Sequence, residues 1–228
     1  MLIAGGIYPV ARAQKKPIYN DGPDFSHEDA VNGLVCGIDE AGRAPLAGPV
    51  TAACVYIPDD VRELDFWKDV KDSKKISLKK REILFEKIKA TCCYGVATAD
   101  QEEIDTLNIH YATFLAMRRA YKNMCDDFTL SPKKVLVDGK FVPELFCERE
   151  ALVKGDNRSY SIAAASILAK VTRDRFMTEL HAQFPFYGWD RNAGYPTKEH
   201  LTALKLHGIT SYHRKSFEPV RQYSLPLM

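Results

Sequence analysis

Two adjacent acidic residues, Asp39 and Glu40, directly follow the apolar run 34–38. A run of this kind is typical of a central β-strand, and two carboxylates at the end of a buried strand are costly unless a cation neutralises them. Neighbouring strand residues point to opposite faces, so the pair can share one cation only if the chain bends where the strand ends. A solvated turn with two exposed acids is the alternative, and these two residues alone leave the choice open.

A third acidic residue, Asp138, ends the short apolar run 134–137 and is followed by Gly139. Asp-Gly is also a common turn sequence, which gives the alternative interpretation. In open α/β sheets, however, sites form at the carboxyl ends of strands. Two strands that both end in acids can therefore bring Asp39, Glu40 and Asp138 together.

The fourth carboxylate has two candidates, Asp156 and Asp174. Asp156 lies just ahead of a long predicted helix over 161–184, where an Asp can also serve as a helix cap. Asp174 lies within that helix, roughly 20 Å from its N-terminus at about 1.5 Å per residue. Because Arg173 and Arg175 flank Asp174, a structural ion pair is the better interpretation for it, and Asp156 is the predicted fourth ligand.

Carboxylates without cysteine or histidine partners favour hard cations with oxygen ligands, above all Mg²⁺ or Mn²⁺. Sites built from acids alone typically serve phosphoryl transfer, in which two metal ions activate water and stabilise the leaving oxygen. The chain has no H-E-x-x-H motif and no C-x-x-C spacing. Its histidines show no metal spacing and are scattered, among them His110, His181, His200, His207 and His213.

Hydrophobic periodicity predicts the elements that must position these acids. Apolar runs predict strands over 34–38, 49–57, 94–99 and 134–137. Amphipathic spacing predicts helices over 78–90, 102–123, 161–184 and 197–206, with Ser77 as the N-cap of the first. Strands first, then helix-strand alternation, then helices indicate an α/β fold with a mixed sheet.

The 228 residues fit one large domain or one domain with an appendage. Residues 1–33 mix charge, glycine and proline without a period, so we expect a poorly ordered leader with room for a short packed piece. Residues 34–221 are expected to form the catalytic domain with its C-terminal helical part, and residues 222–228 a tail.

Composition narrows the class of protein only a little. The net charge of +2 and the pI of about 8.1 are mildly basic, and a nucleic-acid binder would need basic residues gathered on one face. The six cysteines show no zinc or redox spacing, which favours a reducing, cytoplasmic compartment. The opening residues lack a basic and a long apolar region, so a signal peptide is not expected. No run approaches the roughly 20 apolar residues of a membrane span.

Seven blocks of the sequence, in order, closely resemble ribonuclease HII. They are Gly-Ile-Asp-Glu-Ala-Gly-Arg-Ala-Pro-Leu-Ala-Gly-Pro-Val over 37–50, Asp-Ser-Lys-Lys-Ile-Ser over 72–77, Val-Asp-Gly over 137–139, Val-Lys-Gly-Asp over 153–156, the run 161–174, Gly-Tyr-Pro-Thr over 194–197, and Tyr-His-Arg-Lys-Ser-Phe over 212–217. Each block alone is moderately specific. The seven blocks in this order, across about residues 34–221, are far more specific to the family.

The resemblance implies a ribonuclease H-like fold, with a five-stranded mixed sheet flanked by helices and a helical C-terminal part. It implies an endonuclease that hydrolyses the RNA strand of RNA/DNA hybrids and cuts 5′ to single ribonucleotides in duplex DNA, leaving 3′-hydroxyl and 5′-phosphate ends. Two divalent ions, Mg²⁺ or Mn²⁺, would be held by Asp39, Glu40, Asp138 and Asp156. The implied partners are these duplexes, with no membrane, and the chain is expected to act as a monomer.

The resemblance also implies how ribose is recognised. The 2′-hydroxyl both donates and accepts hydrogen bonds, and the family reads it with the backbone of a Gly-Arg-Gly segment, here Gly42, Arg43 and Ala44. Ala44 replaces the second glycine, and its Cβ adds bulk and disfavours positive φ by roughly 1–2 kcal/mol. Weakened activity, or an altered preference for single ribonucleotides, is the expected consequence to test.

Other substrate contacts follow from the same resemblance. Tyr195 matches the tyrosine that stacks on the sugar 3′ of the ribonucleotide, although a loop aromatic packed beside Pro196 is the alternative. Lys74, Lys75 and Lys154 would approach phosphates as point charges, with a solvated basic surface as the alternative. Arg214 and Lys215 could also reach DNA.

Three other functions stay open at this point. Ribonuclease HIII has similar chemistry but carries a sizeable N-terminal substrate-binding domain, for which residues 1–33 are too few. A duplex-binding protein with impaired catalysis is suggested by Ala44, and binding without metal-dependent cutting would identify it. A metal-binding structural domain leaves Lys74, Lys154 and Tyr195 unexplained.

Overall fold

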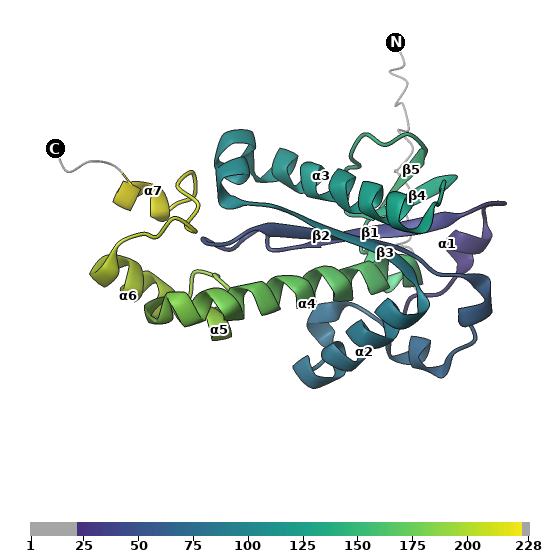
Figure 1. The fold of residues 1–228 in the computed structure, drawn as a ribbon, viewed down its shortest axis with the longest axis horizontal. Helices are drawn as coiled ribbons and strands as arrows, with labels where there is room; N and C mark the ends of the chain where they lie inside the picture. The colour runs from purple at the N-terminus through teal and green to yellow at the C-terminus, as the bar shows by residue number, and fades with distance from the viewer. Residues whose placement is uncertain (1–21, 225–228) are drawn as a thin grey trace, which may run out of the picture.

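A five-stranded mixed sheet forms the centre of the computed structural model, which describes residues 22–224 (Figure 1). Its order is β3-β2-β1-β4-β5, with the first three strands antiparallel and β1, β4 and β5 parallel. The strands are β1 (Val35–Ala41), β2 (Val50–Tyr56), β3 (Cys93–Ala99), β4 (Lys134–Asp138) and β5 (Glu148–Leu152). The mixed α/β sheet expected from the sequence is confirmed.

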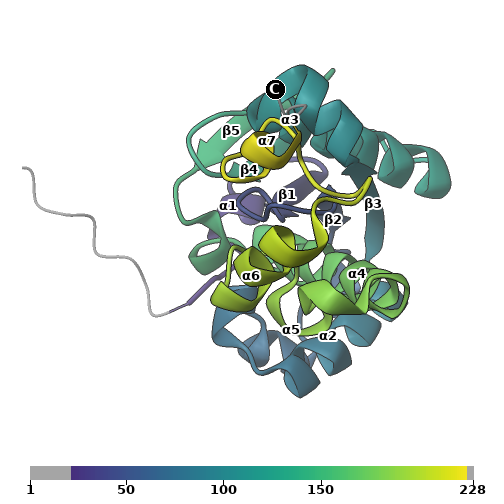
Figure 2. The same ribbon diagram turned by 90° about the vertical axis from the view of Figure 1, so that its left-hand side faces the viewer.

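Helices cover both faces of this sheet. Helix α3 (Gln101–Phe128) lies on one face, and α2 (Leu78–Thr91) and α4 (Tyr160–Gln183) lie on the other (Figure 1). The remaining helices are α1 (Ser26–Asp29), α5 (Trp189–Asn192), α6 (Lys198–His207) and α7 (Val220–Ser224). Helices α5, α6 and α7 gather at one end of the sheet, as the turned view shows (Figure 2). The C-terminal part is therefore helical, as expected.

Side-chain caps explain where the long helices begin. Ser77 accepts a hydrogen bond from the Lys80 N–H at the start of α2, which confirms the predicted N-cap. Asp100 and Glu103 form a reciprocal capping box at the start of α3. None of the described helices is both long enough and apolar enough to cross a membrane.

Strand β5 is the one strand that periodicity did not predict. Its residues Glu148, Arg149 and Glu150 are polar, and its only fully buried residue is Leu152. The reason is its place at the edge of the sheet, paired only with β4. An edge strand needs no continuous apolar run, so its sequence lacks the usual signal.

Within residues 22–33 the structure contains a short packed piece, for which the sequence left room. Helix α1 supplies the buried carboxylate of Glu28, whose Oε1 accepts hydrogen bonds from Ser159 Oγ at 2.6 Å and Ser161 Oγ at 2.7 Å. Asp24 forms a parallel bridge with Ser159. Residues 1–21 of the expected leader and 225–228 of the expected tail lie outside the described residues.

Close contact between β1 and α4 governs the position of the predicted site. A Cβ built on Gly37 would lie 2.3 Å from the backbone nitrogen of Ile162, a distance that no side chain can occupy. Helix α4 presents a run of fully buried small residues, Ala163, Ala164 and Ala165, in the core that it shares with α2. The glycine and the alanines together let the helix backbone approach the strand that carries the first two acids.

Candidate active site

Asp39 and Glu40 lie within β1, which continues to Ala41 rather than ending before the acids. Asp39 is only 7% exposed and Glu40 is half-buried, so the alternative of a solvated turn is wrong. Their partners on β2 are Ala53 and Ala52, which are both fully buried. Asp39 Oδ1 accepts a hydrogen bond from the Glu40 N–H at 2.7 Å.

The parallel pairing of β1 and β4 brings Asp138 to the same end of the sheet. Val137 pairs with Ile38, so Asp138 follows one residue beyond that pair, level with Asp39. Asp138 Oδ1 accepts a hydrogen bond from the Gly155 N–H at 2.7 Å. The acid therefore anchors the turn that carries Asp156 and does more than terminate a strand.

Asp156 lies in the 3₁₀ turn Gly155–Asn157 and does not cap α4. Ser159 is the N-cap of α4, and its side chain accepts the Ile162 N–H. Asp156 Oδ1 instead accepts a hydrogen bond from Asn157 Nδ2 at 2.7 Å. The capping alternative for Asp156 is thereby excluded.

Burial makes all four carboxylates poor sites for negative charge, and repulsion adds to it at Asp39, Glu40 and Asp156. Burial raises the pKa of Asp39 well above its usual value, and the charges of Glu40 and Asp138 raise it further. Burial also raises the pKa of Glu40, although the Arg43 guanidinium opposes this, 3.5 Å from Glu40 Oε1. The pKa values of Asp138 and Asp156 are raised by burial too. Such a cluster favours a bound cation of high charge.

The donor set fits hard divalent cations, because every candidate ligand is a carboxylate. Among the described residues, no three acidic, histidine or cysteine side chains are already gathered into a coordination shell. Asp39 Oδ1 and Asp138 Oδ1 are each engaged by a backbone N–H instead. The carboxylates are neighbours that must turn toward a shared cation to bind it.

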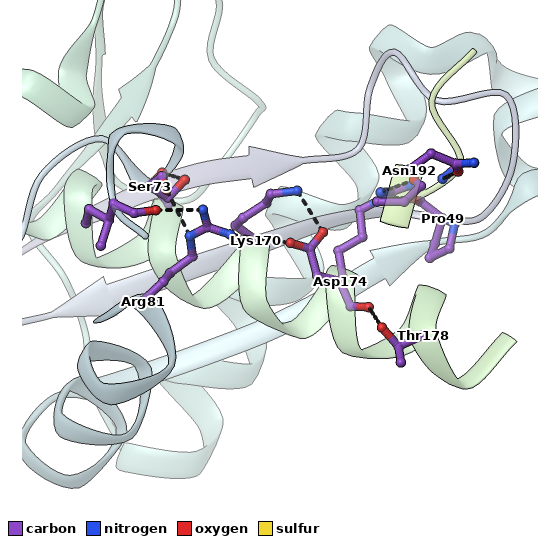
Figure 3. Close-up of polar contacts among 12 residues, drawn as sticks. Pro49, Ser73, Arg81, Lys170, Asp174, Thr178 and Asn192 are labelled. Carbon is purple, nitrogen blue, oxygen red and sulfur yellow. Dashed lines mark hydrogen bonds and ion pairs between the residues drawn. The ribbon is translucent and has the colours of Figure 1, made fainter. Parts of the chain in front are cut away.

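Asp174, the rival fourth acid, is held in ion pairs on α4 (Figure 3). Its Oδ1 lies 2.7 Å from Lys170 Nζ, and its Oδ2 lies 3.5 Å from Arg81 Nη1. Figure 3 also shows Arg81 reaching the backbone of Ser73, with Nε 2.8 Å from the carbonyl oxygen. The expectation of a structural ion pair for Asp174 is confirmed.

Asp156→Asn is expected to lower metal-dependent cleavage by more than about 100-fold, whereas Asp174→Asn should keep it within a few-fold. A lost ligand costs more than the 10–100-fold loss typical of groups that merely support one, while a partly exposed ion pair contributes little. Measuring kcat/KM for the two variants on one duplex decides between the acids. The opposite order would make Asp174 the fourth ligand.

The segment Gly42, Arg43 and Ala44 follows β1 directly. Gly42 is buried with φ +94°, and a Cβ there would lie 2.0 Å from Arg173 Nε, so only glycine fits. Arg43 and Ala44 are exposed. The described non-glycine residues with positive φ are Asn108, Thr129, Lys154 and Ala193. Ala44 therefore carries none of the left-handed strain expected from the sequence, and only the bulk of its Cβ remains.

The other predicted substrate residues lie at the surface. Tyr195 is 37% exposed and lines the same hollow, of about 610 Å³, as Lys170 and Asp174. Lys74 is exposed and lies near the carboxylates, because its charge partly offsets the rise that burial causes in the pKa values of Asp138 and Asp156. Lys154 is exposed with φ +58°. Lys75 lies in a described turn, but its side chain is outside the described part of the structure.

Two buried arginines correct and extend the sequence interpretation. Arg214 was expected to reach DNA, but its side chain is completely buried. Arg173 is 1% exposed and donates to the carbonyls of Pro49, Ala47 and Ala193 at 2.8–3.0 Å. Its position beside an acid in the sequence gave no sign that it holds backbone from two distant segments.

Two histidines that belong to no metal motif in the sequence, His200 and His213, form a buried pair with their Nε2 atoms 3.1 Å apart. The Thr210 N–H donates to His213 Nδ1 at 2.9 Å, so the proton of His213 is on Nε2. His200 can then donate from Nδ1 to the Tyr195 carbonyl at 3.0 Å. Burial lowers the pKa of His213 to about 3 and also lowers the pKa of His200, so burial disfavours the charged form of both. The pair supports the backbone of Tyr195.

This chain is similar to several known proteins of one name. A sequence model of the family described as Ribonuclease HII matches residues 36–220. The chain is 49% identical over 199 residues to the ribonuclease HII of Wolbachia pipientis subsp. Culex pipiens (strain wPip), covering 87% of this chain and 98% of that protein. It is 53% identical over 196 residues to that of Coxiella burnetii (strain Dugway 5J108-111), covering 85% and 93%. The solved ribonuclease H2 from Pyrococcus horikoshii OT3 is similar with a TM-score of 0.65 and 27% identity, covering 83% and 96%.

Proposed function

The chain belongs to the ribonuclease HII family and is thus an endoribonuclease acting on RNA/DNA duplexes, and we propose that it also cuts 5′ to single ribonucleotides in duplex DNA. The matched family is ribonuclease HII rather than ribonuclease HIII. The observation that carries the proposal is the convergence of Asp39, Glu40, Asp138 and Asp156 from three separate segments.

We further propose that these four carboxylates hold two divalent ions, Mg²⁺ or Mn²⁺. When bound, the ions supply an activated water and stabilise the leaving oxygen of the scissile phosphodiester. Asp39 and Asp138 would hold them from adjacent strands, and Asp156 from the turn that Asp138 anchors. Binding would offset the burial and the mutual repulsion that raise the pKa values of Asp39 and Asp156.

The remaining residues would position the duplex around the carboxylates. The backbone N–H groups of the exposed residues Arg43 and Ala44 would contact the 2′-hydroxyl, and Gly42 supplies the turn that presents them. Tyr195 would stack on the sugar 3′ of the ribonucleotide. Exposed Lys74 and Lys154, together with Lys75, would contact phosphates. The six free cysteines support the proposal of a reducing, cytoplasmic compartment.

Two labelled duplexes test the proposal, an RNA/DNA hybrid and a DNA duplex with one ribonucleotide, each with Mg²⁺ or Mn²⁺. Cutting 5′ to the single ribonucleotide supports ribose recognition with alanine at position 44. Cutting of the hybrid alone would contradict recognition at a DNA–RNA junction while leaving the metal site in place. Binding without any cutting would favour the impaired-catalysis alternative and make Ala44→Gly the next variant.

A further inference from the structure

Arg214 holds four backbone carbonyls with a guanidinium that solvent does not reach. Its Nη2 lies 2.6 Å from the Gly42 oxygen and 3.1 Å from the Pro49 oxygen. Its Nη1 lies 2.9 Å from the Arg43 oxygen, and its Nε lies 2.9 Å from the Gly48 oxygen. One side chain thus fixes both ends of the loop that joins β1 to β2.

These contacts are costly to maintain, which indicates a specific role. A buried charge is unfavourable unless its donors are hydrogen-bonded, and burial lowers the pKa of Arg214 to about 9. The neighbouring charge of Arg173 lowers it further. Carbonyl oxygens, rather than a carboxylate, take all four of the hydrogen bonds described above. The result of these hydrogen bonds is a fixed backbone orientation at both ends of the β1–β2 loop.

Fixing a carbonyl also fixes the N–H of the same peptide unit. A trans peptide is planar, and its N–H points opposite to its C=O; the described cis bond is Glu218–Pro219, outside this loop. The Gly42 carbonyl shares its peptide with the Arg43 N–H, and the Arg43 carbonyl shares its peptide with the Ala44 N–H. Because both carbonyls point at Arg214, both N–H groups point away from it, on residues that are exposed.

We infer that Arg214 sets ribose specificity by aiming the N–H groups of Arg43 and Ala44 at the substrate sugar, an inference that rests on the proposed function. Arg214 is a positioning residue, since it acts through backbone and does not touch the substrate. Arg173 extends the same arrangement, because it holds the Ala47 and Ala193 carbonyls together. The Leu46 N–H donates to the Gly194 oxygen at 2.8 Å. This hydrogen bond fixes the β1–β2 loop, residues 42–49, to the turn before Tyr195.

Arg214→Lys tests this inference, because lysine keeps the charge but has a single donor group that cannot hold four carbonyls. Affinity for a one-ribonucleotide duplex and for the matching all-DNA duplex is measured by fluorescence anisotropy in an Asp138→Asn background, which is expected not to cut. The ratio of the two affinities should fall by up to about ten-fold, the effect of one lost neutral hydrogen bond between a backbone N–H and the 2′-hydroxyl. An unchanged ratio in a folded variant overturns the inference.

Arg81→Lys is the matched control. Arg81 is also buried and holds backbone carbonyls, those of Ser73 and Ile76 at 2.8 and 3.0 Å, in the turn that carries Lys74. Its replacement should weaken binding of both duplexes alike and leave their ratio unchanged. A fall in the ratio equal to that of Arg214→Lys would show a general loss of structure and would count against the inference.

Wild-type protein supplies a second measurement in case Arg214→Lys does not fold. In an amide NMR spectrum, the Arg43 and Ala44 N–H signals should shift more on adding the one-ribonucleotide duplex than on adding the all-DNA duplex. Equal shifts would contradict the inference. If wild type neither cuts the one-ribonucleotide duplex nor binds it more tightly than the all-DNA duplex, the proposed function itself is wrong. If Arg214→Lys still prefers the one-ribonucleotide duplex as strongly as wild type does, only the role of Arg214 is wrong.

Discussion

Asp39→Asn is expected to reduce metal-dependent cleavage by more than about 100-fold and, at the same time, to make the metal-free protein more stable. The first effect follows from removing a proposed ligand, which should exceed the 10–100-fold cost of removing groups that only support ligands. The second effect follows from burial. Asparagine keeps the shape and the acceptor for the Glu40 N–H but carries no charge.

The direction of the stability change follows from the pKa of Asp39. Burial, with Glu40 and Asp138 nearby, raises this pKa well above the ordinary 3.8 in the folded protein. The folded state therefore holds a proton that the unfolded chain has already lost, so the metal-free protein loses stability as pH rises through the raised pKa. The asparagine side chain of the variant does not titrate, so the stability of the variant should depend less steeply on pH over that range.

Thermal unfolding without metal, from pH 5 to 8, measures this difference, and adding Mn²⁺ should then stabilise wild type more than the variant. Asp65→Asn is the control, because Asp65 is 94% exposed and its pKa is lowered by Lys68 rather than raised. That control should cut normally and gain no stability. A metal-free Asp39→Asn protein that is less stable than wild type at pH 8 would refute the account of a repulsive cluster.

Gly37→Ala is expected to destabilise the protein by about 3 kcal/mol, the upper range for forcing an extra methyl group into a packed core. The new Cβ would lie 2.3 Å from the backbone nitrogen of Ile162 and from the carbonyl carbon of Ser161. Backbone at the start of a long helix cannot rotate away as a side chain can. Helix α4 must therefore shift off β1, on which Asp39 lies two residues further along.

Urea unfolding of Gly37→Ala, beside Gly22→Ala, measures this effect. A Cβ at Gly22 would meet no atom within 4 Å, and its φ is not in the left-handed region, so that variant should lie within about 0.5 kcal/mol of wild type. Cleavage by the folded fraction of Gly37→Ala should also fall, because the shift separates β1 from the turn that carries Asp156. If Gly37→Ala has the same free energy of unfolding as wild type, α4 approaches β1 less closely than described.

The sequence by itself determined the features that depend on local pattern. Short apolar runs predicted β1 to β4, and the acids that end two of these runs predicted three of the four carboxylates. The flanking arginines of Asp174 predicted its ion pairing, although the partners proved to be Lys170 and Arg81 rather than those neighbours. These features are readable because strand periodicity and local charge are set by residues close in the chain.

Only the tertiary structure decided what distant segments do to one another. Strand β5 has too few apolar residues to be recognised, because an edge strand buries little. Asp156 does not cap α4 because Ser159 is the N-cap of that helix. Glu28 is buried because it contacts residues more than 130 positions away in the sequence. Arg214 looks like a surface cation in the sequence, yet the fold encloses it against the β1–β2 loop, since carbonyl partners carry no sequence signal.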